Sequence, residues 1–472
     1  MPTTNPTFPT DKQMRYLDQL RNYQRLYDGE HAELWGIKDY FVDDTKTEKK
    51  LYITNNLPAL ITDYFADMQI GEGLSYSTED EEAQKTLNEM IEENNLDEVL
   101  YDIAQDQSRY GYGILRVRTT EDGEGDMKVV FEDVNPNEYF PEYDARDRRH
   151  NNPTKVTLVS FLADPLGKYA NGLMYKTIYE RKDEEVTFRY ELRECKVDKT
   201  EGTLLNDNAE YVTLYPEIAD APVTLEYTKR IPIWDVRNLK GRTNPQGKSD
   251  YKDVESLLRE INDRMTHVSV QLIKHLNAKL AVPTGTLSDE EGEEASVKAH
   301  EIDFFEVGEG QMVPQYINNT NSMLEAAFKY TDKLMLTALG IVKVPPELLN
   351  IEGMSGGNEK VEAMRIRLFP SMRKVHRKQV AMRYAVEHAL EYALRVMGKE
   401  DAKVSVEFDD VLPKDMTAVV NQMVARKSAD LVSTRTALEK MDDLSTEEAE
   451  NEAERIRSEA PEIAPFEALP EL

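Results

Sequence analysis

Cysteine and long apolar runs are almost missing from this sequence of 472 residues, in which Cys195 is the single cysteine. One thiol forms no intrachain disulfide and no multi-thiolate metal site, and this usage fits a reducing compartment. No stretch approaches the roughly 20 apolar residues that a membrane-spanning helix requires. The first residues, MPTTNPTFPTDKQ, lack the apolar block of a secretory signal. We therefore expect a protein that stays where it is made and is stabilised by packing or assembly.

Catalytic motifs are missing as well. The seven histidines are dispersed, none in an HExxH pair, and Cys195 has no histidine near it in sequence. The stretch MSGGNEK at 354–360 lacks the spacing of a phosphate-binding loop, so we interpret it as a hinge. Asp122, Glu124 and Asp126 resemble half of a calcium loop, but they fall at the tip of an expected hairpin. The sequence therefore predicts no catalytic residues, no cofactor and no metal.

Positive charge is scarce, with 58 Lys and Arg against 89 Asp and Glu, a formal net charge of -31. Such a balance repels phosphate backbones over most of the surface and argues against a protein that reads DNA sequence. It does not exclude nucleic acid, because a wall with few fixed cations lets a polyanion slide past without holding it.

The first half of the chain has two kinds of pattern. Apolar residues at helical spacing predict a helix from residue 11 to the turn at Tyr27, a second from Leu57 to Gly71 and a third over about 80–110. Period-two patterns between turn residues then predict a mixed α and β region. Its expected strands are Ile114–Val117, Val129–Val134, Val156–Phe161, Thr177–Arg181, Val186–Leu192, Tyr211–Leu214 and Ile231–Val236.

A long helix is the main feature of the second half. Apolar residues at helical spacing run from Tyr251 to Val282 without Pro or Gly, which predicts a helix of roughly 45 Å at 1.5 Å per residue. A polar insert follows, with strand candidates DFFEV and QMVPQYI joined through Gly308 and Gly310. A returning helix is expected over about 321–339. Two helices that run out and back would project the insert outward.

Beyond Gly340, paired prolines and three glycines in 341–358 predict a long loop. A helix then extends from Glu359 to about Met397, with a kink expected at Pro370. A strand is expected at Val404–Phe408. The stretch 442–472 has eleven acidic and two basic residues, so we expect an exposed and partly disordered tail.

The densest group of cations lies on the expected kinked helix. Cations at this spacing could contact phosphates or acidic partners, or they could form a solvated or intersubunit face that pairs with the many carboxylates. We favour the intersubunit face because acidic neighbours are abundant. The group is Arg365, Arg367, Arg373, Lys374, Arg377, Lys378 and Arg383.

This organisation resembles the portal proteins of tailed double-stranded DNA bacteriophages, in the branch with long non-contractile tails. The resemblance covers about residues 14–400. Its landmarks are YQRLYDGEH at Tyr23–His31, NNLPALITDYFADMQIGEGLSY at Asn55–Tyr76, SRYGYGILRV at Ser108–Val117 and VNPNEYFPEYD at Val134–Asp144. The order of these landmarks, followed by helix, insert, helix, loop and kinked helix, is more specific than any one of them. The hinge departs from the family pattern, because Gly356 is followed by Gly357, Asn358 and Glu359.

The resemblance implies an α+β, portal-like fold made of seven segments. They are a wing of N-terminal helices and mixed sheet over 1–250, a first stem helix over 251–282, a small α/β clip over 283–320, a second stem helix over 321–340, a tunnel loop over 341–358, a long kinked helix over 359–398, and a helical crown with the acidic tail over 399–472. Gly356, Gly357 and Pro370 would form the hinge and kink. The tunnel-loop residues nearest to DNA would be Lys343, Val344, Glu347, Asn350 and Glu352.

The implied function is a ring of twelve copies at one capsid vertex, through which DNA is packaged and later ejected. The implied partners are the passing double-stranded DNA, the terminase large subunit, a head-completion or adaptor protein, and the major capsid and scaffolding proteins, with no membrane. The implied location is the virion, with the host cytoplasm during assembly. Two other functions stay open: another capsid or tail structural protein, and a nucleic-acid-processing enzyme.

Overall fold

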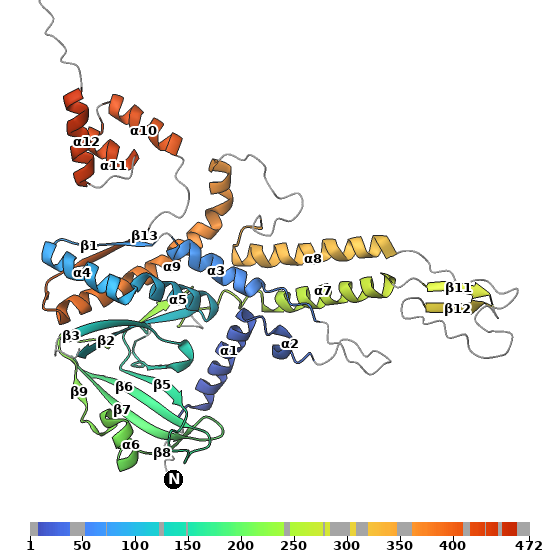
Figure 1. The fold of residues 1–472 in the computed structure, drawn as a ribbon, viewed down its shortest axis with the longest axis horizontal. Coiled ribbons are helices and arrows are strands. Elements are labelled where there is room, and N and C mark those ends of the chain that lie inside the picture. The colour runs from blue at the N-terminus through green and yellow to red at the C-terminus, as the bar shows by residue number, and fades with distance from the viewer. Residues whose placement is uncertain are drawn as a thin grey trace, which may run out of the picture. The chain divides into compact units, whose positions relative to one another are not determined.

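A computed structural model describes residues 8–37, 52–71, 73–121, 127–147, 150–239, 246–276, 279–283, 303–307, 320–346, 361–408, 416–429, 431–441 and 446–459. The fold mixes 50% helix with 22% strand, as an α+β class requires. The chain divides into two compact units (Figure 1). The first comprises Met1–Gly357 and Arg367–Asp409, and the second comprises Asn358–Ile366 and Asp410–Leu472.

The first unit begins with helices α1 (Asp11–Tyr27), α2 (His31–Leu34), α3 (Leu57–Ile70), α4 (Glu81–Asn94) and α5 (Leu96–Arg109). A capping box between Thr10 and Gln13 starts α1. The single helix expected over 80–110 is wrong, because Asn95 has a left-handed φ of 46° and separates α4 from α5. Asparagine tolerates that conformation better than most residues, and no glycine marked the break.

Two antiparallel sheets follow. The smaller has the order β10 (Ile233–Arg237), β2 (Tyr112–Glu121), β3 (Met127–Asp133). The larger has the order β4 (Tyr139–Glu142), β5 (Lys155–Leu162), β6 (Leu173–Lys182), β7 (Glu185–Cys195), β8 (Glu201–Leu204), and β9 (Val223–Thr224) also pairs with β7. Short 3-10 turns occur at Pro136–Glu138 and Pro216–Ala219.

One expected strand is wrong. Tyr211–Leu214 belongs to the helix α6 (Ala209–Leu214). The side chain of Asn208 accepts a hydrogen bond from the backbone N–H of Glu210 and caps this helix. The apolar residues of such a short segment fit both the helical and the strand period, so the N-cap determines that the segment forms a helix.

Helices α7 (Glu255–Leu276) and α8 (Thr320–Val342) pack side by side, and strands β11 (Lys279–Pro283) and β12 (Asp303–Val307) lie beyond their ends (Figure 1). The expected helix through Val282 is therefore too long: it ends at Leu276, and 279–283 is a strand. DFFEV forms β12 and pairs in parallel with β11, from Lys279 with Asp303 to Pro283 with Val307. This pairing is a tertiary interaction that helical spacing cannot indicate. The second candidate strand, 311–317, lies outside the described residues.

Helix α9 (Val361–Val396) is the longest helix among the described residues, and Pro370 lies inside it. Strand β13 (Val404–Phe408) follows and pairs antiparallel with β1 (Leu74–Thr78). The core of this region combines apolar side chains of α3, α4, α5, the smaller sheet and α9. In this way residues more than 300 positions apart form one core in the first unit.

The second unit contains α10 (Met416–Ser428), α11 (Thr434–Met441) and α12 (Thr446–Glu459). Met423, Ala437 and Ala453 are buried on these three helices. Within the acidic stretch 442–472, residues 446–459 form α12, and its Ala453 is buried despite the acidic composition of the helix. The expectation of a partly disordered tail stays a prediction. No helix in the described part of the chain is long and apolar enough to cross a membrane.

Candidate functional site: the junction of α7, α8 and α9

An ion cluster is buried where the start of α7, the end of α8 and the middle of α9 meet. Asp250 lies just before α7, and Lys374 and Lys378 lie one turn apart on α9. The Nζ of Lys374 is 2.9 Å from Oδ1 of Asp250, and the Nζ of Lys378 is 2.8 Å from Oδ2. All three side chains are at most 5% exposed, so water does not screen their charges.

Neutral donors complete the shell around the Asp250 carboxylate. Ser108 Oγ donates to Oδ2 at 2.7 Å, and Asn238 Nδ2 donates to Oδ1 at 2.9 Å. The backbone N–H of Asp250 also donates to the carbonyl of Ser108 at 3.0 Å. Burial alone raises the pKa of Asp250, but the positive charges of Lys378 and Lys374 and the hydrogen bonds that their ammonium groups donate hold the pKa well below its usual value. The carboxylate is therefore a fixed anion that joins α5, β10, α7 and α9.

The two lysines are opposed by burial. Burial lowers the pKa of Lys378 to about 8 and also lowers the pKa of Lys374, although Asp250 attracts both ammonium groups. The face of Phe65 on α3 offsets part of this cost, because its centroid is 3.9 Å from Lys374 Nζ and 4.8 Å from Lys378 Nζ. With both lysines and Asp250 ionised, the cluster has one net positive charge.

Lys374 also holds the end of α8. Its Nζ donates to the carbonyl of Val342 at 2.9 Å, and Ser371 Oγ donates to the carbonyl of Lys343. A cation at a helix C-terminus interacts favourably with the helix dipole. These bonds connect α9 to the residues where the predicted tunnel loop starts.

The end of α8 has the geometry of a Schellman motif. Lys343 adopts a left-handed φ of 68°, and the N–H of Val344 donates to the carbonyl of Leu339 at 3.0 Å. Leu339 and Val344 are both buried, as the hydrophobic contact of that motif requires. The expected helix end at Gly340 is therefore wrong, because glycine lies inside α8 and a lysine takes the left-handed position.

A second set of hydrogen bonds fixes α7. Asn262 of α7 donates through Nδ2 to Nδ1 of the buried His31 at 2.7 Å, and Nε2 of that ring donates to the carbonyl of Leu26 at 2.8 Å. Burial lowers the pKa of His31, which favours this neutral ring. Asn262 Oδ1 accepts from the N–H of Asn55 at 3.0 Å. His31 is thus a packed imidazole with a positioning role.

The predicted tunnel-loop residues are only partly described. Lys343 is exposed, whereas Val344 is buried at 2% exposure and packs with residues of α7 and α8, so its side chain faces the core of its own chain. The apolar side chain of Val344 completes the helix end. The predicted proximity of these residues to DNA stays a prediction. Glu347, Asn350 and Glu352 lie outside the described residues, as do Gly356 and Gly357 of the predicted hinge.

The predicted intersubunit basic face needs a correction. Lys374 and Lys378 are 4% and 1% exposed and point into the ion cluster, because they share a helical stripe with the buried Val375 and Met382. Arg383 is half-buried, with its guanidinium 5.6 Å from the Phe408 centroid. The remaining side chains with a described position, Arg367, Arg373 and Arg377, are exposed. The side chain of Arg365 is outside the described set.

Sequence reasoning missed Asp250, Ser108, Asn238 and Phe65. The spacing of Lys374 and Lys378 within an apolar stripe was the available signal, since buried lysines need an anionic partner. Nothing local to 250 identified that partner. Within the described ranges, no group of three His, Cys, Asp or Glu side chains is arranged to hold a metal ion.

The cluster predicts a dependence of stability on pH. Because the pKa of Lys378 is about 8 in the folded state, below its ordinary 10.5, the unfolded state binds more protons between these values, and the free energy of unfolding rises with pH. The difference in the free energy of unfolding between wild type and Lys378→Met, measured by urea denaturation, should grow by roughly 1–2 kcal/mol from pH 8 to 9.5. Parallel pH profiles for the two proteins would contradict a buried ammonium.

Comparison with known families identifies the chain. The model of the family described as phage portal protein, SPP1 Gp6-like, matches residues 9–465. The class is that of phage portal proteins, which are structural and not enzymatic. Because the match spans nearly the whole chain, the protein belongs to the SPP1 Gp6-like portal family. The resemblance found in the sequence is thereby confirmed.

Two solved structures are similar at low sequence identity. A chain of the virion of a native gene transfer agent particle is 12% identical, with a TM-score of 0.44, over 89% of this chain and 92% of that chain. A chain from the neck of such a particle, computed with C12 symmetry, is 13% identical, with a TM-score of 0.38, over 81% and 89%. No curated protein sequence matches the chain significantly.

Proposed function

We propose that this protein forms a ring of twelve copies at one capsid vertex, through which double-stranded DNA enters during packaging and leaves during ejection. The family match over 9–465 is the observation that carries this proposal. A head-to-tail interface that closes on rotation encloses a central hole. The excess of carboxylates, a net charge of -31, would let DNA slide without strong fixed contacts.

Each segment has a proposed role. Residues 1–250 form the wing, α7 and α8 are the stem helices, β11 and β12 belong to the clip, and 399–472 form the crown. The exposed Lys343, together with Glu347, Asn350 and Glu352, is proposed to lie nearest to DNA. Gly356, Gly357 and Pro370 act as hinge and kink between the tunnel loop and the long helix.

In the proposed ring, the ion cluster connects both stem helices with α9 and with the start of the tunnel loop. Lys374 binds both Asp250 before α7 and the carbonyl of Val342 at the end of α8. Any displacement of the segment after Val344 therefore acts on both stem helices and on α9 at once. We assign the cluster the role of keeping the tunnel loop, stem and wing in one geometry while DNA passes.

The partners follow from this role. The clip would dock the terminase large subunit during packaging and a head-completion or adaptor protein afterwards, and the wing would contact major capsid and scaffolding proteins. ATP hydrolysis belongs to the terminase. The protein would act in the virion, and in the host cytoplasm during assembly.

The mass of the purified protein tests the proposal. Twelve copies of a 54.2 kDa chain give about 650 kDa for a closed ring. Light scattering coupled to size exclusion is expected to give a mass within about one subunit of that value. A single species with the mass of one chain, at every protein concentration tested, would contradict the ring and favour another structural role.

A further inference from the structure

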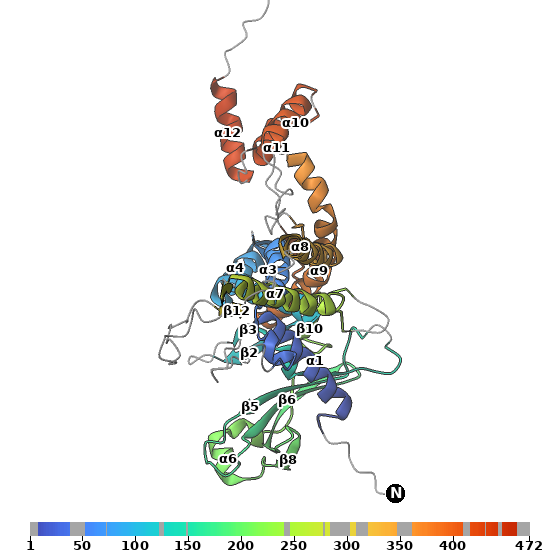
Figure 2. The same ribbon diagram turned by 90° about the vertical axis from the view of Figure 1, so that its right-hand side faces the viewer.

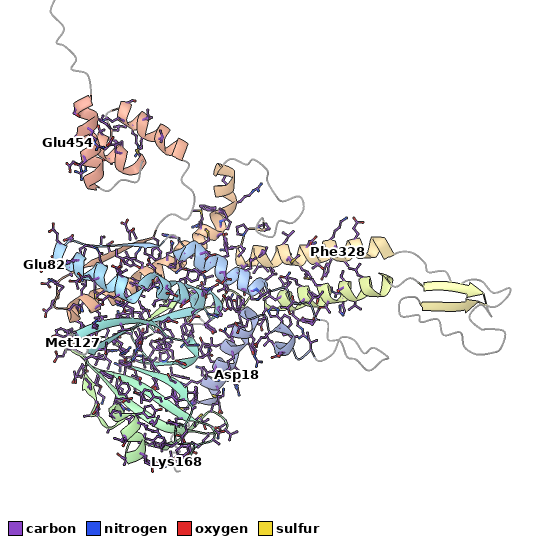
Figure 3. All side chains as sticks on the ribbon, in the orientation of Figure 1. Asp18, Glu82, Met127, Lys168, Phe328 and Glu454 are labelled. Atoms are coloured by element: carbon purple, nitrogen blue, oxygen red, sulfur yellow. The ribbon has the colours of Figure 1, made fainter. Side chains whose placement is uncertain are left out.

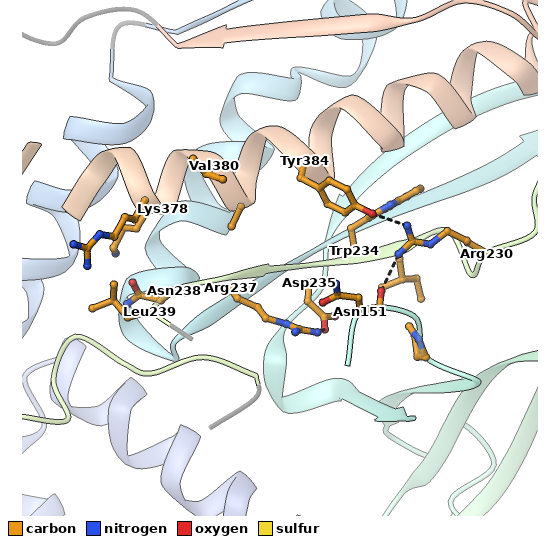
Figure 4. A pocket seen from close by; sticks show the side chains of 14 residues that line it. Asn151, Arg230, Trp234, Asp235, Arg237, Asn238, Leu239, Lys378, Val380 and Tyr384 are labelled. Atoms are coloured by element: carbon orange, nitrogen blue, oxygen red, sulfur yellow. Dashed lines mark hydrogen bonds and ion pairs between the residues drawn. The ribbon is translucent and has the colours of Figure 1, made fainter. Parts of the chain in front are cut away.

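A cationic and apolar pocket of about 740 Å³ lies beside α9 in the first unit (Figure 4). Its described walls are Asn151 and Pro153, the flank of β10 and one side of α9. Arg230 is held in place there, because its guanidinium donates to Tyr384 Oη and to the carbonyl of Asn151, both at 2.8 Å. Trp234 lines the pocket between these groups.

Part of the α9 wall of this pocket belongs to an exposed stripe of the helix. Arg373, Arg377, Val380 and Tyr384 follow one another at intervals of four, three and four residues, and all are exposed. Val380 is 55% and Tyr384 is 46% exposed. Apolar and aromatic side chains that are uncovered beside arginines are the composition of a protein interface. We call Arg230, Arg377, Val380 and Tyr384 the arginine groove.

A surface of opposite sign lies on α4. Glu81, Glu89, Glu92 and Glu93 are exposed, and Lys85 is the one cation of this helix. Glu92 and Glu93 fall in the last turn, which contains no basic residue, although the helix dipole disfavours anions there. Glu92 and Glu93 therefore do not stabilise α4 through the helix dipole, and their position needs another explanation. We call the four glutamates the acidic ridge, and Figure 3 shows the neighbouring Glu82 at the surface of the same helix.

A head-to-tail contact requires that the two surfaces lie on different sides of one chain. In Figure 2, α4 lies on one side of the helical layer and α9 on the other side. Tyr384 binds Arg230, so it marks the position of that arginine along α9. At 1.5 Å per residue, Arg377 and Tyr384 are about 10 Å apart along α9. Glu81 and Glu89 are about 12 Å apart along α4. Two arginines could thus face two glutamates of another helix.

We propose that the arginine groove of one copy receives the acidic ridge of the next copy in the ring. This assignment rests on the proposed ring and names the surfaces that would close it. A second copy fits better than DNA, because DNA phosphates would leave Val380 and Tyr384 uncovered, and the net charge of -31 repels DNA from most of this chain.

Charge reversal tests the contact in the full-length protein. Arg230→Glu/Arg377→Glu and, separately, Glu81→Lys/Glu89→Lys should each lower the fraction of protein in rings at least tenfold, measured by light scattering. Combining all four changes in one chain should restore rings. Arg21→Glu/Arg25→Glu on α1 matches the charge change of the groove variant and should assemble like wild type. Arg377→Glu alone, which leaves the Arg230 bonds intact, guards against a folding defect.

The outcomes separate the two proposals. If wild type forms rings and the groove variants form them equally well, the contact assignment is overturned and the ring stands. If the groove variants keep their rings but lose binding to a double-stranded DNA fragment, DNA is the occupant and the assignment is again wrong. If wild type forms no ring, the proposed function fails together with the contact that depends on it.

Discussion

Replacing Asp250 by asparagine is expected to lower the free energy of unfolding by about 3–5 kcal/mol, because two buried ammonium groups lose the carboxylate that pairs with both. Lys374 and Lys378 are 2.9 and 2.8 Å from its oxygens. The side-chain amide of the introduced asparagine could still accept a hydrogen bond, but it carries no charge to offset the desolvation of the lysines. Urea denaturation followed by circular dichroism measures the loss.

The matched control is Asp253→Asn, three residues further along. The Asp253 side chain is 59% exposed and pairs with Lys248 at the surface, so its removal should cost less than ~1 kcal/mol. A partial rescue of Asp250→Asn by Lys378→Met, which removes one stranded cation, would show that charge is the cause. Equal, small losses for Asp250→Asn and Asp253→Asn would contradict the role given to the cluster.

Gly247→Ala is the second substitution with a large expected effect. Gly247 has a φ of 115°, and a Cβ there would lie 2.0 Å from the carbonyl oxygen of Gly111, whose own backbone accepts a hydrogen bond from Asn238 at 2.9 Å. An alanine must therefore displace the backbone that positions Asp250 and Asn238. Left-handed strain alone costs roughly 1–2 kcal/mol, and we expect a total above ~3 kcal/mol with the clash.

Gly167→Ala separates the two contributions. Gly167 has a φ of 65°, and no atom lies within 4 Å of the position of a Cβ. Its loss should be limited to the strain of the left-handed conformation, roughly 1–2 kcal/mol. The difference between the two variants in thermal and urea unfolding reports the steric contribution. If Gly167→Ala destabilised the protein as much as Gly247→Ala, the close approach of 111 and 247 would be wrong.

The sequence predicts those elements of the fold whose apolar residues repeat over several turns. The spacing around Leu57 gives α3 and the spacing around Leu390 gives α9, because a buried stripe requires that period. Breaks that depend on one residue are harder to predict. Asn95 ends α4 through its own conformation, and the helix of 251–282 loses its last residues to a strand that pairs with 303–307.

The candidate site is harder to predict than the fold. Lys374 and Lys378 stand out in sequence as cations, and the dense cluster of like charges suggested a surface. Their burial depends on Asp250, which is more than 120 positions away and becomes a partner only when α7 and α9 meet. A pairwise contact of this kind has no local pattern. Segments such as the tunnel loop are predicted by glycine and proline content, which indicates a loop and not its conformation.

Electron cryo-microscopy of the purified, full-length protein would show whether it assembles into a portal ring. We expect closed rings with a central channel, with α7 and α8 arranged around the axis and the acidic ridge of each copy against the arginine groove of the next. Particles without a central hole, in which these two helices are covered by their own chain on every side, would contradict the proposed ring.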